Sequence, residues 1–176
     1  MTVDADQSGA TASETLQEWI ARYRQVPLGD DSWVYASFAE LVARHGQAYE
    51  PAAWPMPDAQ QPGRCFHVAR RWAEEAGWTY VEGFVLVPSE IPFSGFEHAW
   101  CLTAEGKVAD PALPDGWATA YFGVPLSDRF CREQRALRGT DAVLTFDPVK
   151  FWEGANTTIL RQGLPSYAVS LTERTA

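Results

Sequence analysis

The fold is decided by residues 62–77, which read PGRCFHVARRWAEEAG. Apolar and small side chains recur along this run at helical spacing, and Gly77 closes it, so we predict a helix from about Arg64 to Ala76. Its apolar side holds Phe66, Ala69, Trp72, Ala73 and Ala76. Cys65 shares that side in the first turn, where unpaired N–H groups and the positive end of the helix dipole make a sulfur more nucleophilic.

A β-hairpin is predicted over residues 98–111. Its two arms read HAWCL, at 98–102, and KVADP, at 107–111. Gly106 suits a three-residue loop with a bulge, because glycine accepts a positive φ. With that loop, His98 and Asp110 fall on one face as diagonal neighbours, about 7–8 Å apart at the backbone. A two-residue loop would put them on opposite faces, so the predicted pairing depends on the bulged turn.

Cys65, His98 and Asp110 are the residue types that acyl transfer needs. A thiol nucleophile requires a base, and the base requires a partner that orients it. The N–H of Cys65 is one candidate donor to a developing oxyanion. Candidates for the second donor all precede the cysteine, and they are Gln60, Gln61 and the indole of Trp54.

Each of these residues also has a purely structural interpretation. A cysteine on the apolar side of a helix is more often a small hydrophobic residue, and this is how we interpret Cys101 and Cys131. An Asp-Pro pair more often starts a turn. No Cys or His pair has the spacing of a zinc site, and the chain lacks a glycine-rich phosphate loop, so no metal and no cofactor are expected.

Size and charge limit the classes of function. The chain has 176 residues, 46% of them apolar, which favours a single domain with a substantial core. Its net charge of -9 argues against a nucleic-acid partner and against a surface attracted to anionic lipid. No run approaches the ~18 apolar residues of a membrane span. The polar N-terminus lacks the features of a secretion signal, so we predict a soluble cytoplasmic protein with reduced thiols.

The remaining segments are assigned from caps, periodicity and turn residues. The predictions are disorder over 1–10, a helix from Thr11 to before Pro27, a helix from Asp30–Ser32 to Gly46, an irregular Pro-rich connection over 47–63, a central strand over 80–87, a loop over 88–96, a strand over 121–126 and a helix from 127 to 138. The last 35 or so residues carry no firm assignment.

Three short motifs resemble the transglutaminase-like branch of the papain-like cysteine superfamily. They are Gly63-Arg64-Cys65 at a helix start, His98-Ala99-Trp100 opening a strand, and Asp110-Pro111 closing the next. The resemblance covers residues 60–125. It implies an α+β papain-like fold over residues 11–176, with a helical part at 11–46 and a catalytic core at 64–126. In such a fold the nucleophile helix packs on an antiparallel sheet.

The resemblance also implies an activity. A Cys-His-Asp triad of this kind attacks an amide, peptide, ester or thioester carbonyl and forms a thioester intermediate. The expected protein is therefore a cysteine amidase, peptidase or acyltransferase acting on a small amide, peptide or acyl-thioester substrate, and water and an amine stay open as acceptors. The chain departs from the family in showing no calcium loop and no clear counterpart of the upstream glutamine. Two alternatives remain, an inactive binding module of the same fold and a Cys/His metal protein.

Overall fold

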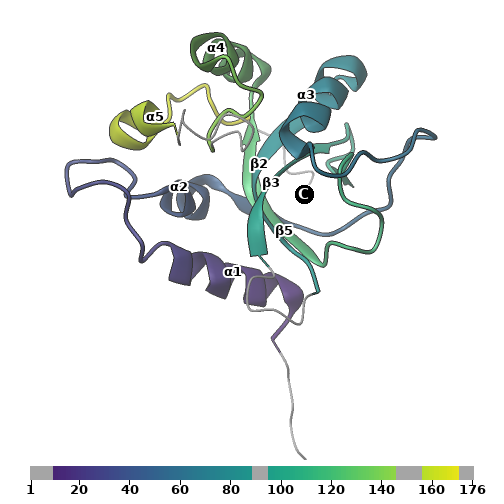
Figure 1. The fold of residues 1–176 in the computed structure, drawn as a ribbon, viewed down its shortest axis with the longest axis horizontal. Helices are drawn as coiled ribbons and strands as arrows, with labels where there is room; N and C mark the ends of the chain where they lie inside the picture. The colour runs from purple at the N-terminus through teal and green to yellow at the C-terminus, as the bar shows by residue number, and fades with distance from the viewer. Residues whose placement is uncertain (1–9, 89–94, 146–155, 171–176) are drawn as a thin grey trace, which may run out of the picture.

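The structure, a computed structural model, describes residues 10–88, 95–145 and 156–170. It is a mixed α+β protein built on one curled, antiparallel five-stranded sheet in the order β1-β5-β2-β3-β4 (Figure 1). The strands are β1 (Gln47–Tyr49), β2 (Thr79–Leu86), β3 (Gly95–Leu102), β4 (Val108–Ala109) and β5 (Ala120–Leu126). The helices are α1 (Ala12–Tyr23), α2 (Phe38–His45), α3 (Cys65–Ala76), α4 (Asp128–Arg138) and α5 (Thr157–Gln162). The α+β class and the antiparallel sheet predicted from the sequence are confirmed.

Local capping explains why three of the helices begin and end where the sequence predicts. Thr11 caps α1 in a reciprocal capping box with Glu14, and Ser127 caps α4 by accepting from a first-turn N–H. Gly77 and Gly139 end α3 and α4 in the left-handed conformation, which costs glycine little. These signals lie within a few residues of each helix end, so they are readable from the sequence.

The second helix begins later than the sequence predicts. The cap is Ser37 and not the segment Asp30–Ser32. The Asp30 carboxylate instead accepts from the N–H of Ser32 at 2.9 Å and forms a local turn. The N–H of Tyr35 donates to the carbonyl of Leu160 at 2.9 Å. This backbone contact with α5 holds the segment out of the helix, and it joins residues far apart in the sequence.

Three further assignments are corrected or added. The first residues of the Pro-rich connection are not irregular, because β1 pairs there with β5 at the sheet edge. Strand β3 begins at Gly95, within the predicted loop 88–96, of which residues 89–94 lie outside the described residues. Helix α5 occupies part of the unassigned C-terminal region. The predicted disorder at 1–10 falls outside the described residues except at Ala10.

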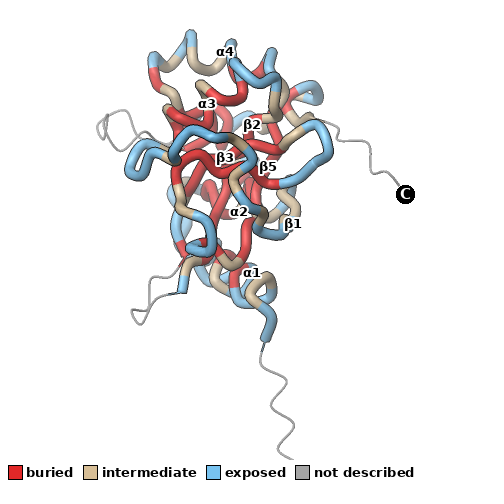
Figure 2. Tube along the Cα trace, turned by 90° about the vertical axis from the view of Figure 1, so that its right-hand side faces the viewer, coloured by how far each residue is buried: buried red, intermediate tan, exposed pale blue. Residues whose placement is uncertain are grey.

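Both faces of the sheet are covered by apolar side chains, which form two hydrophobic clusters. The larger cluster joins the sheet to α1, α2 and α3. The smaller one lies on the opposite face and consists of Val81, Val85, Trp100, Leu102, Val108, Ala118 and Tyr121. Figure 2 shows buried residues running through the strands and exposed residues along α1 and α4. Because side chains alternate along each strand, both faces of the sheet are buried under apolar side chains. His98 lies on the same face as Trp100.

The hairpin has the register that the bulged turn predicts. The N–H of Thr103 donates to the carbonyl of Lys107 at 2.9 Å, and β3 pairs with β4 through Cys101 opposite Ala109. Gly106 has a φ of +74°, a conformation that a residue with a Cβ adopts only at a cost. This confirms the register that places Trp100 opposite residue 110 and brings two candidate site residues to one face.

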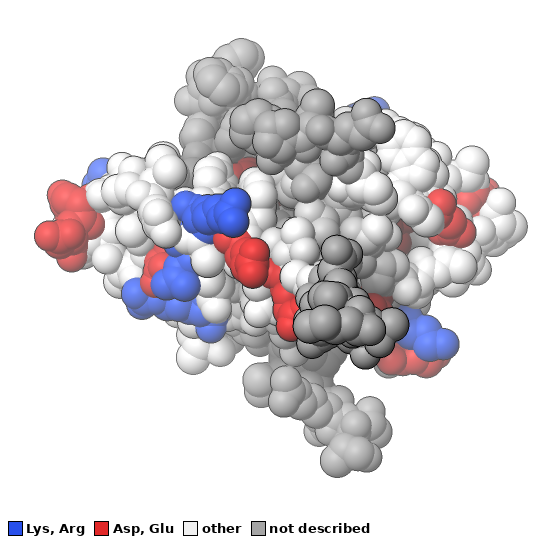
Figure 3. Space-filling view, turned by 90° about the horizontal axis from the view of Figure 1, so that it is seen from below, with Lys and Arg blue, Asp and Glu red and all other residues white. Residues whose placement is uncertain are grey.

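The outer surface carries both signs of charge. Seen from the side of α1, acidic and basic side chains lie next to one another (Figure 3). The Glu40 carboxylate contacts Arg24 and Arg44, each at 2.6 Å. Within the described residues, no helix is both long enough and apolar enough to span a bilayer.

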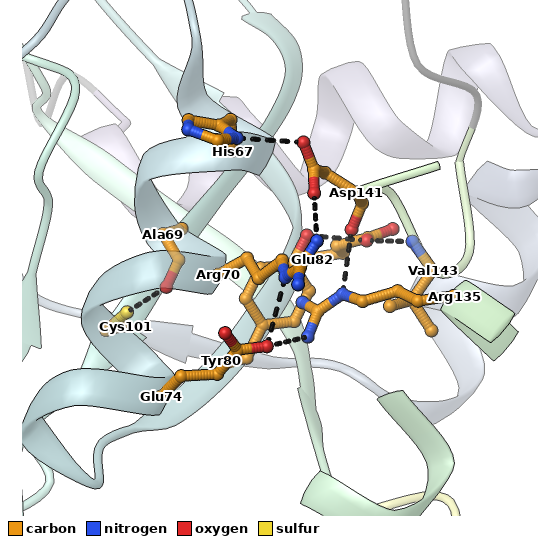
Figure 4. A network of polar contacts seen from close by, with 10 residues as sticks. All are labelled: His67, Ala69, Arg70, Glu74, Tyr80, Glu82, Cys101, Arg135, Asp141 and Val143. Atoms are coloured by element: carbon orange, nitrogen blue, oxygen red, sulfur yellow. Dashed lines mark hydrogen bonds and ion pairs between the residues drawn. The ribbon is translucent and has the colours of Figure 1, made fainter. Parts of the chain in front are cut away.

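Glu82 lies fully buried in the central strand β2 and holds the segment after α4. Its carboxylate accepts from the hydroxyl of Tyr80 at 2.8 Å and from the backbone N–H of Val143 (Figure 4). It also accepts from the backbone N–H groups of Leu144 and Thr145. Four donors bind the two oxygens of Glu82. This position therefore suits a carboxylate, which only accepts hydrogen bonds. Glu82 therefore links the sheet to residues 143–145.

Replacing Glu82 by glutamine is expected to lower the free energy of unfolding by about 3 kcal/mol, because the amide turns its own N–H groups toward backbone donors. Urea unfolding at neutral pH measures the change. The matched control is Glu97→Gln, since Glu97 accepts from the hydroxyl of Thr145 and glutamine can do the same. Equal losses in the two variants would show that the donors around Glu82 contribute no special stability.

Candidate active site

A buried histidine and a buried aspartate form the centre of the candidate site. His98 of β3 is 2% exposed and Asp110, directly after β4, is 3% exposed. Their atoms Nε2 and Oδ2 lie 2.7 Å apart. Since Nε2 is occupied by the carboxylate, the second ring nitrogen, Nδ1, is the one left for another partner. The diagonal pairing expected from the hairpin register is thus present.

The thiol of Cys65 is the group near His98 that could fill this place. Its side chain lies close enough to His98 to raise the pKa of the imidazole, after the larger influence of Asp110. Strand β4 pairs only with Cys101 and Leu102, so the part of β3 that carries His98 has no strand beside it on that side within the described residues. Helix α3 packs against β3, and its first residue, Cys65, is near enough to His98 to influence the imidazole. The structure therefore brings Cys65, His98 and Asp110 together.

The two buried groups shift one another's protonation. Burial is the largest influence on His98 and lowers its pKa, but the Asp110 charge and hydrogen bond, together with Cys65, outweigh burial and raise the pKa to about 10. Burial is the largest influence on Asp110 and raises its pKa. The charge of His98 and the hydrogen bonds that the Asp110 carboxylate accepts outweigh burial, so the pKa of Asp110 lies below its ordinary value. The ring is consequently protonated, and the carboxylate charged, through neutral pH.

Asp110 is held in position by more than the histidine. Its Oδ1 accepts from the N–H groups of Ala112 at 2.8 Å and Leu113 at 3.0 Å. The hydroxyl of Tyr121, in β5, donates to Oδ2 at 2.8 Å. From the sequence alone Tyr121 is predicted only to lie in a strand, because the position of β5 in the sheet depends on pairing between segments far apart in the chain.

Aromatic rings enclose the imidazole. Trp100 stacks on His98, with ring centroids 6.2 Å apart and planes at 17°, and Phe96 meets it edge-on at 5.9 Å. Both rings come from the same strand and the same face. They exclude water from the histidine and fix the orientation of its ring. A general base needs a fixed orientation to transfer a proton to or from a reacting group.

The structure gives two of the three candidate oxyanion donors, Gln60 and Trp54, other hydrogen-bond partners. The amide of Gln60 donates to the backbone carbonyls of Asp110, at 2.8 Å, and Leu113. The indole N–H of Trp54 donates to the carbonyl of Asp58 at 2.7 Å. Gln61 has an exposed side chain, and its backbone N–H donates to the carbonyl of Pro111 at 2.7 Å. Gln60 and Gln61 thus hold the loop after Asp110 against the residues that precede Cys65.

The start of α3 is left without a side-chain cap. Arg64 stands at the cap position and makes no capping hydrogen bond, whereas Thr11, Ser37, Ser127 and Asn156 cap the other four described helices. The φ of the preceding Gly63 is +85°. First-turn N–H groups of an uncapped helix point at whatever lies before it. At Cys65 they are available to a negatively charged oxygen.

A pocket of about 620 Å³ opens beside Cys65, between α3 and α4. Its lining comprises Gly63, Arg64, Cys65, Phe66, His67, Arg70, Glu74, Arg132, Arg135, Ala136, Gly139, Thr140 and Asp141. Neither His98 nor Asp110 lines this pocket. Of the three candidate catalytic residues, only Cys65 does. The sequence does not indicate this pocket, because four strands, β2 to β5, separate α3 from α4 along the chain.

Within the residues that the structure describes, no group of three or more His, Cys, Asp or Glu side chains is arranged to hold a metal ion. Comparisons of the chain with protein-family models, with curated proteins and with solved structures find no match. The interpretation of the site therefore depends on its own geometry.

Replacing Tyr121 by phenylalanine is expected to cost about 1–3 kcal/mol of stability, because the buried carboxylate loses a donor. We expect kcat/KM to fall only about tenfold, since two backbone N–H groups still orient Asp110. Urea unfolding and steady-state kinetics measure both effects. Tyr49→Phe is the control, because Tyr49 packs on Trp100 without touching Asp110. Equal activity losses in the two variants would contradict the role of Tyr121.

Stability is expected to fall as the pH rises from about 6.5 to about 10. The folded protein binds the His98 proton more tightly than the unfolded chain does, so this stabilisation is complete below the unfolded pKa and is lost as the pH passes the folded one. The difference in unfolding free energy between wild type and His98→Gln should shrink by roughly 2–4 kcal/mol over this range. A difference independent of pH would show that the folded pKa is not raised.

Proposed function

We propose that this protein is a cysteine acyl-transfer enzyme of papain-like architecture, with Cys65 as nucleophile, His98 as proton carrier and Asp110 as the group that orients and charges the histidine. The observation that carries the proposal is the buried contact of 2.7 Å between Nε2 of His98 and Oδ2 of Asp110, on a histidine whose pKa Cys65 also raises. A helix start without a cap lies at the same cysteine.

The first half of the reaction forms a thioester. In the reactive form the imidazole carries both ring protons, which the raised pKa of His98 favours, and the sulfur of Cys65 is the nucleophile. The sulfur attacks the carbonyl carbon of the substrate, and a C–S bond forms. The carbonyl oxygen becomes negative and accepts from the N–H of Cys65 and other first-turn N–H groups of α3. The bond to the leaving group then breaks, and His98 donates the proton to that group.

The second half releases the acyl group. The neutral imidazole takes a proton from water or from an amine, which attacks the thioester carbon. The C–S bond breaks, and the sulfur leaves with its charge balanced by the imidazolium. The product is an acid when water attacks and an amide when an amine attacks. Asp110 keeps its charge throughout and stabilises each imidazolium.

Turnover of small aryl esters, thioesters and amides tests the proposal. The wild-type protein should release the leaving group from at least one of them at a rate that saturates with substrate. Adding a primary amine and separating acid from amide by chromatography then distinguishes hydrolysis from transfer. Release at the uncatalysed rate with all three substrate types would contradict an acyl-transfer function and favour a binding module of the same fold.

A further inference from the structure

We infer that the pocket between α3 and α4 binds an anionic group of the acyl donor, a carboxylate or a phosphate. The inference rests on the proposed function, because it takes Cys65 as the reacting residue. The pocket is the described cavity that Cys65 lines, and its volume of about 620 Å³ suits a small-molecule substrate.

The pocket is positively charged although the whole chain carries a net charge of -9. Its lining has four arginines, Arg64, Arg70, Arg132 and Arg135, and two acids, Glu74 and Asp141. The acidic surface elsewhere repels an anion, and the excess of arginine attracts it to this place. The charge of the pocket therefore reverses that of the chain.

The two acids are already engaged by basic groups (Figure 4). Asp141 contacts Nη1 of Arg70 at 2.8 Å and Nδ1 of His67 at 3.0 Å. Glu74 contacts Nε of Arg70 at 3.0 Å and, more distantly, Nη1 of Arg135 at 3.7 Å. These contacts occupy the carboxylates, so neither acid is left to attract a cation or to neutralise the remaining arginines.

Two arginines remain for a ligand. Arg64 and Arg132 are exposed, and neither forms an ion pair with any residue that the structure describes. Arg64 adjoins Cys65 at the start of α3, and Arg132 lies on α4, on the other side of the pocket. A guanidinium presents a planar pair of donors that matches a carboxylate or a phosphate. The anion would thus lie close to the reacting carbonyl.

Single-turnover acylation of Cys65 tests this inference with three matched thiophenyl esters, one neutral (acetyl), one with a carboxylate (succinyl) and one with a phosphonate (phosphonoacetyl). We expect at least one anionic ester to acylate Cys65 about tenfold faster than the neutral ester at low salt. Arg64→Gln and Arg132→Gln should each remove most of that ratio. Arg129→Gln, which removes an arginine paired with Glu133 outside the pocket, should preserve it.

Equal rates for the neutral and anionic esters, or ratios that the two pocket variants leave intact, would overturn the inference and leave the proposed function standing. A second readout is independent of acylation. Inorganic phosphate or succinate, compared with chloride at equal ionic strength, should slow the alkylation of Cys65 by iodoacetamide, and this protection should disappear in Arg64→Gln. If no ester acylates Cys65, the proposed function fails, and the protection measurement alone then decides whether the pocket binds anions.

Discussion

Replacing Cys65 by alanine is expected to abolish turnover of the ester or amide substrate, with kcat/KM falling at least about 10³-fold. The expectation follows from the mechanism, because no thioester forms without the sulfur. The fold should be retained, since Cys65 is only partly buried and alanine suits the first turn of a helix. Thermal unfolding and steady-state kinetics of the purified variant measure the two effects.

Cys101 provides the matched control for that experiment. Its thiol is buried under α3 and donates to the carbonyl of Ala69 at 3.2 Å, and burial raises its pKa far above the ordinary value. Cys101→Ala should therefore lose stability by an amount typical of a core residue and keep the activity of whatever fraction is folded. A folded Cys65→Ala protein with the activity of the wild type would contradict the assignment of the nucleophile.

Replacing Asp110 by asparagine is expected to lower kcat about 10³–10⁴-fold while leaving the fold intact. The backbone donors of Ala112 and Leu113 fix an oxygen at the Oδ1 position, so the new NH₂ group must take the place of Oδ2. There it donates to Nε2 of His98. The ring proton is forced onto Nδ1, which can then no longer take a proton from the thiol.

Kinetics of Asp110→Asn, compared with those of Asp30→Asn, measure that effect. Asp30 holds a local turn by accepting from Ser32, a bond that asparagine also makes, so the control should match the wild type. A loss of less than about tenfold in a folded Asp110→Asn protein would show that the carboxylate does not set the tautomer of His98.

The parts of the fold that the sequence predicts are those with local causes. Thr11, Ser127, Gly77 and Gly139 act within a turn of the helix ends that they define, and the helices have the predicted bounds. Gly106 sets the hairpin register within a few residues. By contrast, the sequence offers two local caps for α2, Asp30–Ser32 and Ser37, and the choice of Ser37 accompanies a hydrogen bond from Tyr35 to the backbone near the opposite end of the chain.

The same distinction applies to the candidate site. The placement of His98 beside Asp110 follows from one turn, so the pairing is predictable from the sequence. Tyr121 reaches Asp110 only because β5 pairs with β2, and the anchoring of Gln60 depends on the return of the chain after β4. The pocket beside Cys65 forms only because α4 faces the start of α3. Each of these contacts joins segments that are distant in the sequence, and no local pattern reveals their partners.

The central claim, that His98 and Asp110 activate Cys65, is tested most directly by acid-quenched mass spectrometry of the protein mixed with a reactive acyl thioester. We expect one acyl group per chain, located on the peptide that contains Cys65 and removed by hydroxylamine. We also expect acylation to be slower by at least about 10²-fold in His98→Gln. An acyl group on Cys101 or Cys131, or acylation of Cys65 at an equal rate in His98→Gln, would contradict the claim.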